Sequence, residues 1–379
     1  MKKSKSLLAL TSAALALPAL ADTAPQTSQV GYRLSNYQED PAPADKTVEG
    51  STERYHIEVH QFRLSTPLNE QTALTLDVAT ETMSGASPWG TQAGEGNETN
   101  LIMSEASIDE SRTDVRAKAI FYGDKDDITV GIGHSQENDY RSLSGNVSVQ
   151  RALNNKHTVV NGGMSFSNDD LKPTQGENDT NTHKAKKWSL SLFSGVSQII
   201  DKTTLGQLGV SLTHLNGFLT DTYKSGDHRP STRNQLTATG GLRHHYPDLG
   251  ASGHLDARFY ADDWLIFSYT LDAAWHQSLF EHYEIVPSMR YYSQSQAKFF
   301  DPYFSGVNEG GYFSSDYRLS PYGAITNGLK LIANYQRWSF SLLAERYQSS
   351  AGLAIRAVAQ ESPALVSFTR ITLGIDADF

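Results

Sequence analysis

The 379-residue sequence contains no cysteine, and this absence excludes disulfides, thiolate metal sites and covalent haem attachment. Beyond its first 20 residues it also lacks any run of about 18 apolar residues, so the remainder holds no candidate membrane helix. Basic residues are in the minority, with 32 Lys and Arg against 42 Asp and Glu. The resulting formal charge of −10 argues against nucleic acid as a partner.

The first 21 residues have the features of a secretory signal peptide. Three lysines precede an apolar run from Leu7 to Leu20, and Ala-Leu-Ala at 19–21 is typical of a cleavage site. The run is shorter and richer in alanine than a membrane-spanning helix requires. We therefore predict cleavage after Ala21 and one β-barrel domain over 22–379. Losing the three lysines changes the formal net charge to −13.

Alternation of apolar and polar residues is what the sequence has in abundance. Roughly sixteen segments, each about ten or more residues long, carry apolar residues at every second position. In the final segment, Ile371, Leu373 and Ile375 share one face, and Arg370 and Thr372 lie on the other. No helical periodicity of useful length competes, and no repeat of fixed length is evident. The pattern predicts β-strands with one apolar and one polar face.

The connections between these segments alternate in length. Short connections are predicted at 65–70, 124–127, 154–156, 201–202, 247–250, 280–282 and 335–336. The other set contains long polar stretches at 38–52, 83–110, 169–185, 217–232, 297–316 and 348–364, and two tight turns near Asp139 and Asp262. Bacterial outer-membrane barrels place short turns in the periplasm and long loops outside. An even strand count, which includes a first strand at 28–37, puts both termini on the periplasmic side.

A soluble β-sandwich is the main alternative for such alternation. Sandwich strands average about 5–6 residues, whereas a bilayer requires about 9–11 tilted residues per strand. The polar face, rich in Gly, Ser, Thr and Asn, would make a poor core but a well-hydrated lumen. Aromatic residues gather at the short-turn ends (Trp275, Tyr283, Trp338 and Phe379) and near the long-loop ends (Trp264 and Tyr291). We predict an all-β, up-and-down antiparallel transmembrane barrel of about 16 strands, embedded in outer-membrane lipid and lipopolysaccharide.

The chain ends on an aromatic residue at the end of its last alternating strand. A terminal strand that finishes on Phe379 resembles the signal that outer-membrane barrels present to their assembly machinery. We therefore expect Phe379 to act as the assembly signal and to lie at the periplasmic interface.

Apolar residues toward lipid would leave a mixed set of charges in the lumen. The predicted inward cations are Arg33, Arg54, Arg116, Lys118, Arg243, Arg258, Arg290 and Arg370. The predicted inward acids are Glu58, Asp77, Glu81, Asp114, Glu137, Asp256, Asp272, Glu284, Asp376 and Asp378. About half of these charges are expected to brace the barrel as pairs. His56, Glu58 and His60 have spacing suited to metal ligation, but water-solvated side chains explain them better, so we predict no metal or cofactor.

Several motifs resemble one bacterial family. They are TMSGASPW (82–89), SQENDY (135–140), DTYKSGDHRPSTR (221–233), RFYADDW (258–264), RYYSQSQAKFF (290–300), YRLSPYGA (317–324) and PALVSFTRITLGIDADF (363–379). Together they are similar to the family called domain of unknown function 3570, and the weakest match is at 349–360. The resemblance implies the outer membrane of a Gram-negative bacterium and supplies no activity or catalytic residues.

Three functions fit these observations. A porin-like channel for small hydrophilic solutes is favoured, because about sixteen strands enclose room for an aqueous lumen. A receptor or scaffold barrel with a periplasmic or surface partner is the alternative, favoured if the 83–110 loop or residues 22–52 plug the lumen. An outer-membrane enzyme is the third and least favoured function, because no nucleophile, base and third group converge on one face, and we therefore do not expect catalysis.

The topology also predicts a shared site at the extracellular mouth. Its residues are Glu137, Asp139, Tyr140, Tyr223, Lys224, Arg229, Arg233, Asp262, Asp263, Trp264, Arg290 and Tyr292. Such a cluster could brace the loops, hold a divalent cation or select solutes, and scattered surface charge is the plainer reading.

Overall fold

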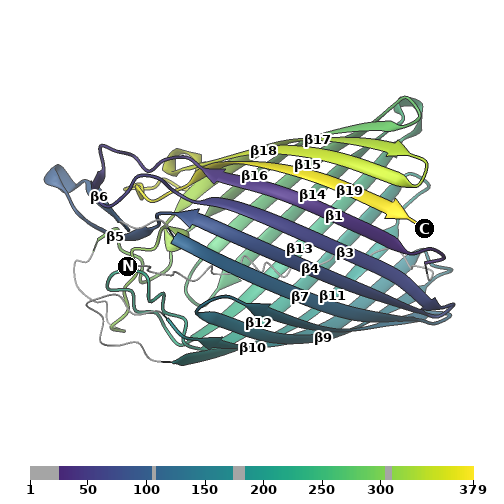
Figure 1. Ribbon diagram of the computed structural model, residues 1–379, viewed down its shortest axis with the longest axis horizontal. Coiled ribbons are helices and arrows are strands. Elements are labelled where there is room, and N and C mark those ends of the chain that lie inside the picture. The colour runs from purple at the N-terminus through teal and green to yellow at the C-terminus, as the bar shows by residue number, and fades with distance from the viewer. Residues whose placement is uncertain (1–24, 105–107, 174–183, 304–309) are drawn as a thin grey trace.

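The computed structural model describes residues 25–104, 108–173, 184–303 and 310–379. Sixteen antiparallel strands close into a barrel, which confirms the predicted all-β class and strand number (Figure 1). In chain order the barrel strands are β1 (Gln29–Glu39), β3 (His56–Asn69), β4 (Thr72–Gly85), β7 (Ile108–Tyr122), β8 (Asp126–Gln136), β9 (Tyr140–Leu153), β10 (Thr158–Leu171), β11 (Ala185–Ile199), β12 (Thr204–Gly217), β13 (Thr232–Tyr246), β14 (Ala251–Asp262), β15 (Phe267–Leu279), β16 (Tyr283–Gln294), β17 (Tyr322–Tyr335), β18 (Trp338–Ser350) and β19 (Ser367–Asp378). The predicted signal peptide lies outside the described residues.

The remaining elements lie in the connections. They are β2 (Thr47–Glu49), β5 (Pro88–Ala93), β6 (Thr99–Met103) and the 3-10 turns η1 (Glu95–Asn97), η2 (Pro247–Leu249), η3 (Tyr317–Leu319) and η4 (Ala351–Leu353). Strands β2, β6 and β5 form a separate three-stranded sheet at one end of the barrel (Figure 1). Among the described residues, no helix has the length and apolar character needed to cross a membrane.

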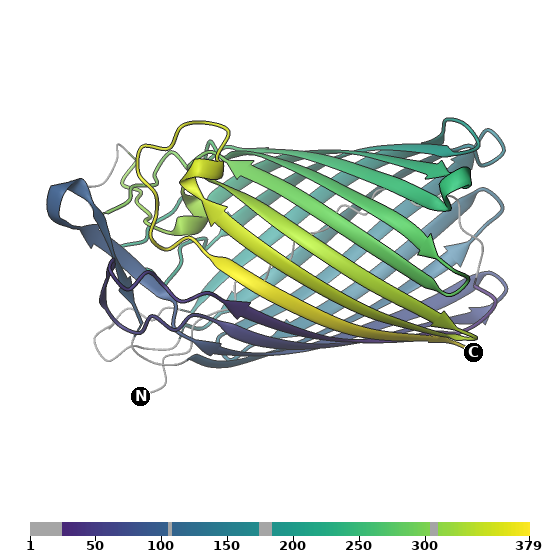
Figure 2. The ribbon, with the colours of Figure 1, turned by 90° about the horizontal axis from the view of Figure 1, so that it is seen from above.

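The barrel closes where its first strand meets its last. Strand β1 pairs with β19 from Gln29 opposite Asp378 to Glu39 opposite Phe368. Ser28 and Phe379 exchange backbone hydrogen bonds of 2.9 Å, so the first strand belongs to the barrel. Figure 2 shows that the strands are joined by short turns at the end where the chain finishes and by long connections at the other end. The predicted two-sided asymmetry is confirmed, and it identifies the long-loop end as extracellular.

Alternation along each strand separates a lipid face from a lumen face. In the middle of β11, Leu192 pairs with Met164 and Leu212, and all three side chains are about half exposed on the outside. The neighbouring Ser191 points the other way and shares a 2.8 Å hydrogen bond with Thr213. Barrel strands of 11 to 15 residues exceed the length that a tilted strand needs to cross a bilayer.

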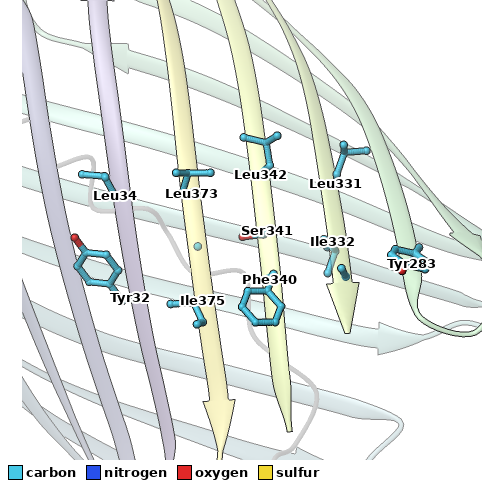
Figure 3. Close-up of a pocket in the computed structure, with 12 residues that line it drawn as sticks. Tyr32, Leu34, Tyr283, Leu331, Ile332, Phe340, Ser341, Leu342, Leu373 and Ile375 are labelled. Atoms are coloured by element: carbon cyan, nitrogen blue, oxygen red, sulfur yellow. The ribbon is translucent and has the colours of Figure 1, made fainter. Parts of the chain in front are cut away.

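A shallow groove of about 610 Å³ runs along the lipid face at the closing seam (Figure 3). Its lining includes one row of leucines that are neighbours across four strands, namely Leu34, Leu373, Leu342 and Leu331. Such ridges are the expected surface of strands whose alternate residues face acyl chains.

Ion pairs line the lumen wall, and all of those named here except Arg116–Asp114, which lies within β7, join neighbouring strands. The pairs and their closest distances are Arg33–Asp376 at 2.7 Å, Arg63–Asp77 at 2.5 Å, Arg116–Asp114 at 2.8 Å, Arg243–Asp256 at 2.7 Å and Arg290–Asp272 at 2.5 Å, and Arg370 also contacts Glu345. The side chains of Arg63, Arg116 and Arg290 nevertheless remain 65%, 54% and 59% exposed. Solvent therefore reaches the inner wall, and the pairs brace neighbouring strands instead of filling the lumen.

Some predicted orientations are wrong. Glu58, His56 and His60 share the face of Phe62, which is exposed opposite Val78 on the outside, so this trio faces outward. The prediction assumed that apolar residues face lipid, but Ile57 and Val59 point inward at the extracellular end of β3, so their polar neighbours point outward. His60 bonds there to Tyr32 at 2.7 Å and to Glu58 at 3.0 Å.

Three further residues lie in the connections and not in strands. Arg54 and Glu137 were predicted to face the lumen, and Trp264 was predicted in the aromatic girdle. Arg54 and Glu137 precede β3 and follow β8, respectively. Trp264 was expected at the membrane interface, but it is buried at 2% exposure against Phe299. All three positions lie beyond strand ends, where period-2 alternation no longer predicts orientation.

Candidate functional site

The long connections pack together into an extracellular cap. We define the cap as the described parts of the β1–β3, β4–β7, β12–β13, β16–β17 and β18–β19 connections together with the short β14–β15 connection. Two small apolar clusters stabilise it. One contains Trp264, Ile266, Ala297, Phe299, Phe300 and Leu319, and the other contains Ala42, Ala86, Leu101, Met103 and Ala364. Each cluster draws residues from different connections, so the cap folds as a unit with its own buried contacts.

Backbone and side-chain contacts link the cap across the barrel mouth. The amide of Ser225 donates to the carbonyl of Trp89 at 2.7 Å, and Thr91 donates to the carbonyl of Pro302. Four barrel strands separate β7 from β12, and four separate β17 from β4. Contacts between connections that lie so far apart around the ring must run over the mouth. The cap therefore covers part of the opening.

A buried ion-pair network joins the β12–β13 and β16–β17 connections. We define it as Asp221, Asp227, Arg229, Asp316 and Arg318. Arg229 lies 2.8 Å from both Asp227 and Asp316. Arg318 contacts Asp316 and lies 2.5 Å from Asp221. The carboxylates of Asp227 and Asp316 are fully buried, so each depends on its guanidinium partner for compensation.

The electrostatics of this network follow from burial and close arginines. Burial alone would raise the pKa of Asp316, but Arg318, Lys224 and Arg229 together hold that pKa far below its usual range. At Asp227 the balance is opposite, because burial raises the pKa more than Arg229 lowers it. Burial also lowers the pKa of Lys224, whose ammonium donates to the carbonyl of Pro88 and lies 5.8 Å from the Tyr317 ring centre.

A second buried pair holds the β1–β3 connection of the cap against its β18–β19 connection. Arg54 lies 2.7 Å from Glu39, and both side chains are almost completely buried. The same guanidinium donates to the carbonyl of Ala364 at 3.1 Å and lies 5.8 Å from the ring centre of Tyr317. Tyr317 is therefore shared between Arg54 and Lys224, which links the two buried charge clusters.

Carboxylates crowd around a single arginine at the extracellular ends of β4, β7 and β8. Arg112 lies 3.7 Å from Glu81, 3.4 Å from Asp114 and 3.7 Å from Glu137. Its Nε donates a 2.9 Å hydrogen bond to Ser135. Burial, then the neighbouring acids, raise the pKa of Glu137 to about 8 despite the attraction of Arg112.

The structure divides the predicted mouth residues into three groups. Tyr223 donates to Asp139 between the β12–β13 connection and the β8–β9 turn, close to Lys224, Arg229 and Glu137. Arg233 forms a separate group, at 2.6 Å from Asp262 and 4.3 Å from the Trp264 ring centre. Asp263 accepts from Asn234 at 2.7 Å beside this second group.

The remaining members lie in the strands. Arg290 pairs with Asp272 on the lumen wall, four residues before β16 ends. Tyr292 donates to Gln294 at 2.6 Å, and Tyr140 lies 5.1 Å from the Lys187 ammonium. Sequence reasoning missed Asp227, Asp316 and Arg318, although Arg318 stands in the quoted motif YRLSPYGA and Asp227 in DTYKSGDHRPSTR. Those motifs were the available signal.

The family model described as "Protein of unknown function (DUF3570)" matches residues 7–363. The chain belongs to this family. The match includes 349–360, where the motif resemblance is weakest, and ends before β19. No curated protein matches the chain by sequence.

Solved structures share the architecture. A bacterial polysaccharide outer membrane secretin aligns over 93% of this chain and 98% of its own, with 8% identity and a TM-score of 0.52. CdiB from Acinetobacter baumannii aligns over 93% of this chain and 60% of its own, with 6% identity and a TM-score of 0.54. OprB from Pseudomonas putida covers 93% of both chains at 8% identity with a TM-score of 0.46. At these identities the first two support the outer-membrane barrel fold alone.

Proposed function

We propose that this barrel is an outer-membrane channel for small hydrophilic solutes, with its narrowest passage in the extracellular cap. The observation that carries the proposal is the solvent exposure of Arg63, Arg116 and Arg290 on the lumen wall, each above half. A lumen filled by packed side chains would bury these guanidinium groups. A hydrated lumen of sixteen strands is wide enough for solutes.

The neutral part of the wall supports hydrophilic cargo. Hydroxyl pairs join neighbouring strands at Ser167–Ser189 (2.9 Å), Ser191–Thr213 (2.8 Å) and Ser35–Thr372 (2.8 Å). Hydroxyls both donate and accept hydrogen bonds, so such a wall exchanges bonds with water and with polar solutes. We assign the barrel no catalytic reaction and no cofactor. Outer-membrane lipid and lipopolysaccharide would surround it, and Phe379 would act as the signal to the assembly machinery.

The packed cap favours a second candidate function. A cap whose connections are joined by buried ion pairs and two apolar clusters could present a binding surface and leave the lumen closed. In that case the chain is a receptor or scaffold barrel with a periplasmic or surface partner. The two functions differ in one measurable property, the passage of ions through the isolated protein.

Conductance in planar bilayers tests the channel. We expect discrete steps from the refolded chain, and larger steps from a variant in which Asn-Gly replaces 88–103. That deletion preserves its base, because the amide of Ser104 donates to the carbonyl of Ser87 at 3.0 Å. Arg151→Ala, on an exposed outward pair with Asp126, is the matched control and should conduct like the wild type. Silent bilayers for both the wild type and the deletion would favour the receptor or scaffold.

A further inference from the structure

The carboxylates around Arg112 are not balanced by local cations. Glu81, Asp114 and Glu137 all lie within 3.7 Å of this one guanidinium, and Glu110 is buried beside them. Arg116 takes part of the charge by pairing with Asp114 at 2.8 Å. A buried group of this kind is costly when every acid is ionised, because attraction to one or two cations cannot offset the desolvation of four carboxylates.

Glu137 is the least compensated member. Its side chain has no solvent exposure, and neither carboxylate oxygen accepts a hydrogen bond from the described part of the chain. Its nearest cation is Arg112 at 3.7 Å, beyond hydrogen-bonding distance. A carboxyl group in this position is most stable when it carries a proton. The raised pKa of about 8, caused first by burial, agrees with this geometry.

Charged groups approach Glu137 from every element around it. They are Glu81 on β4, Glu110, Arg112 and Asp114 on β7, Asp139 in the same turn and Lys187 on β11, and the neutral phenol of Tyr140 stands at the start of β9. Lys187 is shared with Asp169, from which it lies 3.9 Å away. The acids outnumber the cations, so this environment disfavours the ionised form of Glu137.

The same turn attaches the cap to the barrel. The amide of Glu137 donates to the carbonyl of Tyr140 at 2.7 Å, and the amide of Asn138 donates to Glu110 at 3.1 Å. Asp139, two residues on, accepts from Tyr223 of the β12–β13 connection. Repulsion that displaces Glu137 would therefore also disturb the contact between the turn and the cap.

We propose that Glu137 is a proton-binding switch that keeps the β8–β9 turn docked to the cap when protonated and loosens this contact when it ionises. The docked state holds a proton that an opened, hydrated turn releases, because an exposed glutamate ionises near 4.5. The contribution of Glu137 to docking is therefore fully present below about pH 4.5, and the docking equilibrium weakens as the pH rises toward about 8, by up to roughly tenfold per pH unit. Only its effect on permeation rests on the proposed channel.

Hydrogen exchange of the refolded full chain in detergent tests the switch without any channel assay. After correction for intrinsic rates, we expect wild-type peptides covering 137–140 and 220–225 to exchange at least tenfold faster at pH 8.5 than at pH 5.5. Glu137→Gln, a permanently neutral isostere, should remove this dependence and stay protected at both values. Glu49→Gln removes the same charge from an exposed position on β2 and should behave like the wild type.

The outcomes separate the possibilities. Equal protection of the wild type at both pH values would overturn the switch even if Glu137→Gln fails to fold. A different result would favour a cation site and overturn the switch. In that case the wild type is protected whenever millimolar Ca²⁺ is present and unprotected without it, equally at pH 5.5 and pH 8.5. A conductance that stays constant while exchange changes with pH would refute the link to permeation and leave the switch standing.

Discussion

At the scale of single residues, burial decides which ion pairs hold the molecule together. The guanidinium of Arg229 is 8% exposed and its two carboxylate partners are fully buried. Arg63 is 65% exposed and faces water on the lumen wall. An exposed pair contributes about 0–1 kcal/mol, whereas removing one partner of a buried pair costs about 3–5 kcal/mol. The cap pairs therefore stabilise a structure, and the wall pairs mainly set the charge of the passage.

Arg229→Met tests this contrast. It leaves Asp227 and Asp316 buried without their shared partner, so local opening of the cap should become about 3–5 kcal/mol easier. Limited proteolysis should then cleave the 217–232 and 310–321 segments rapidly while the barrel strands stay uncut. Arg151→Met breaks an exposed pair and should change cleavage by less than a factor of about five. Unchanged cleavage of Arg229→Met would mean that the network does not hold the cap.

The sequence predicted part of this residue-level arrangement. Asp139, Tyr223, Lys224 and Arg229 were expected at the mouth and do meet there, because each stands at or beyond the end of a predicted strand. The partner Asp316 was not found, since loop residues have no periodicity and their contacts come from distant connections. Arg290 was predicted at the rim, but β16 continues to Gln294 and places it on the lumen wall. The motif alone does not indicate the residue at which the strand ends.

At the scale of elements, alternation is reliable where one face meets lipid and fails where the strand leaves it. The sixteen barrel strands follow from period-2 patterns, and β1 was included for that reason. β3 reverses its polarity at its extracellular end, where His56 and Glu58 face outward. β2, β5 and β6 were not predicted, because strands of three to six residues that pack on other loops carry no long alternation.

Leu192→Arg and Ser191→Arg test the assignment of the two faces. Position 192 lies near the middle of β11 on the lipid face, where an arginine should cost about 2–4 kcal/mol of folding free energy. Position 191 faces the lumen, so its arginine stays hydrated and should cost far less. Urea titration in lipid vesicles, followed by tryptophan fluorescence, measures both. Equal destabilisation by the two neighbours would contradict the inside–outside assignment.

At the scale of the whole molecule, the described connections cover the opening at one end of the barrel and leave only short turns at the other. The short turns at the periplasmic end contain two to four residues and cannot reach across the opening, whereas the cap does. Access to the lumen should therefore be asymmetric. The absence of cysteine makes this testable, because any thiol introduced into the chain is the only one to react.

Ser148→Cys places a thiol on the lumen face of β9, and Val147→Cys places its neighbour on the lipid face. In permeabilised cells a membrane-impermeant thiol reagent should label position 148 rapidly and position 147 slowly, because only the first side chain faces water. In intact cells the reagent must pass the cap, so labelling of position 148 should slow by about tenfold or more. Replacing 88–103 with Asn-Gly should restore fast labelling from outside, since this segment carries the contacts to Ser225 and Pro302. Equal rates from both sides in the wild type would show that the cap does not restrict entry, and the passage would then be limited by the charged wall at Arg63, Arg116 and Arg290.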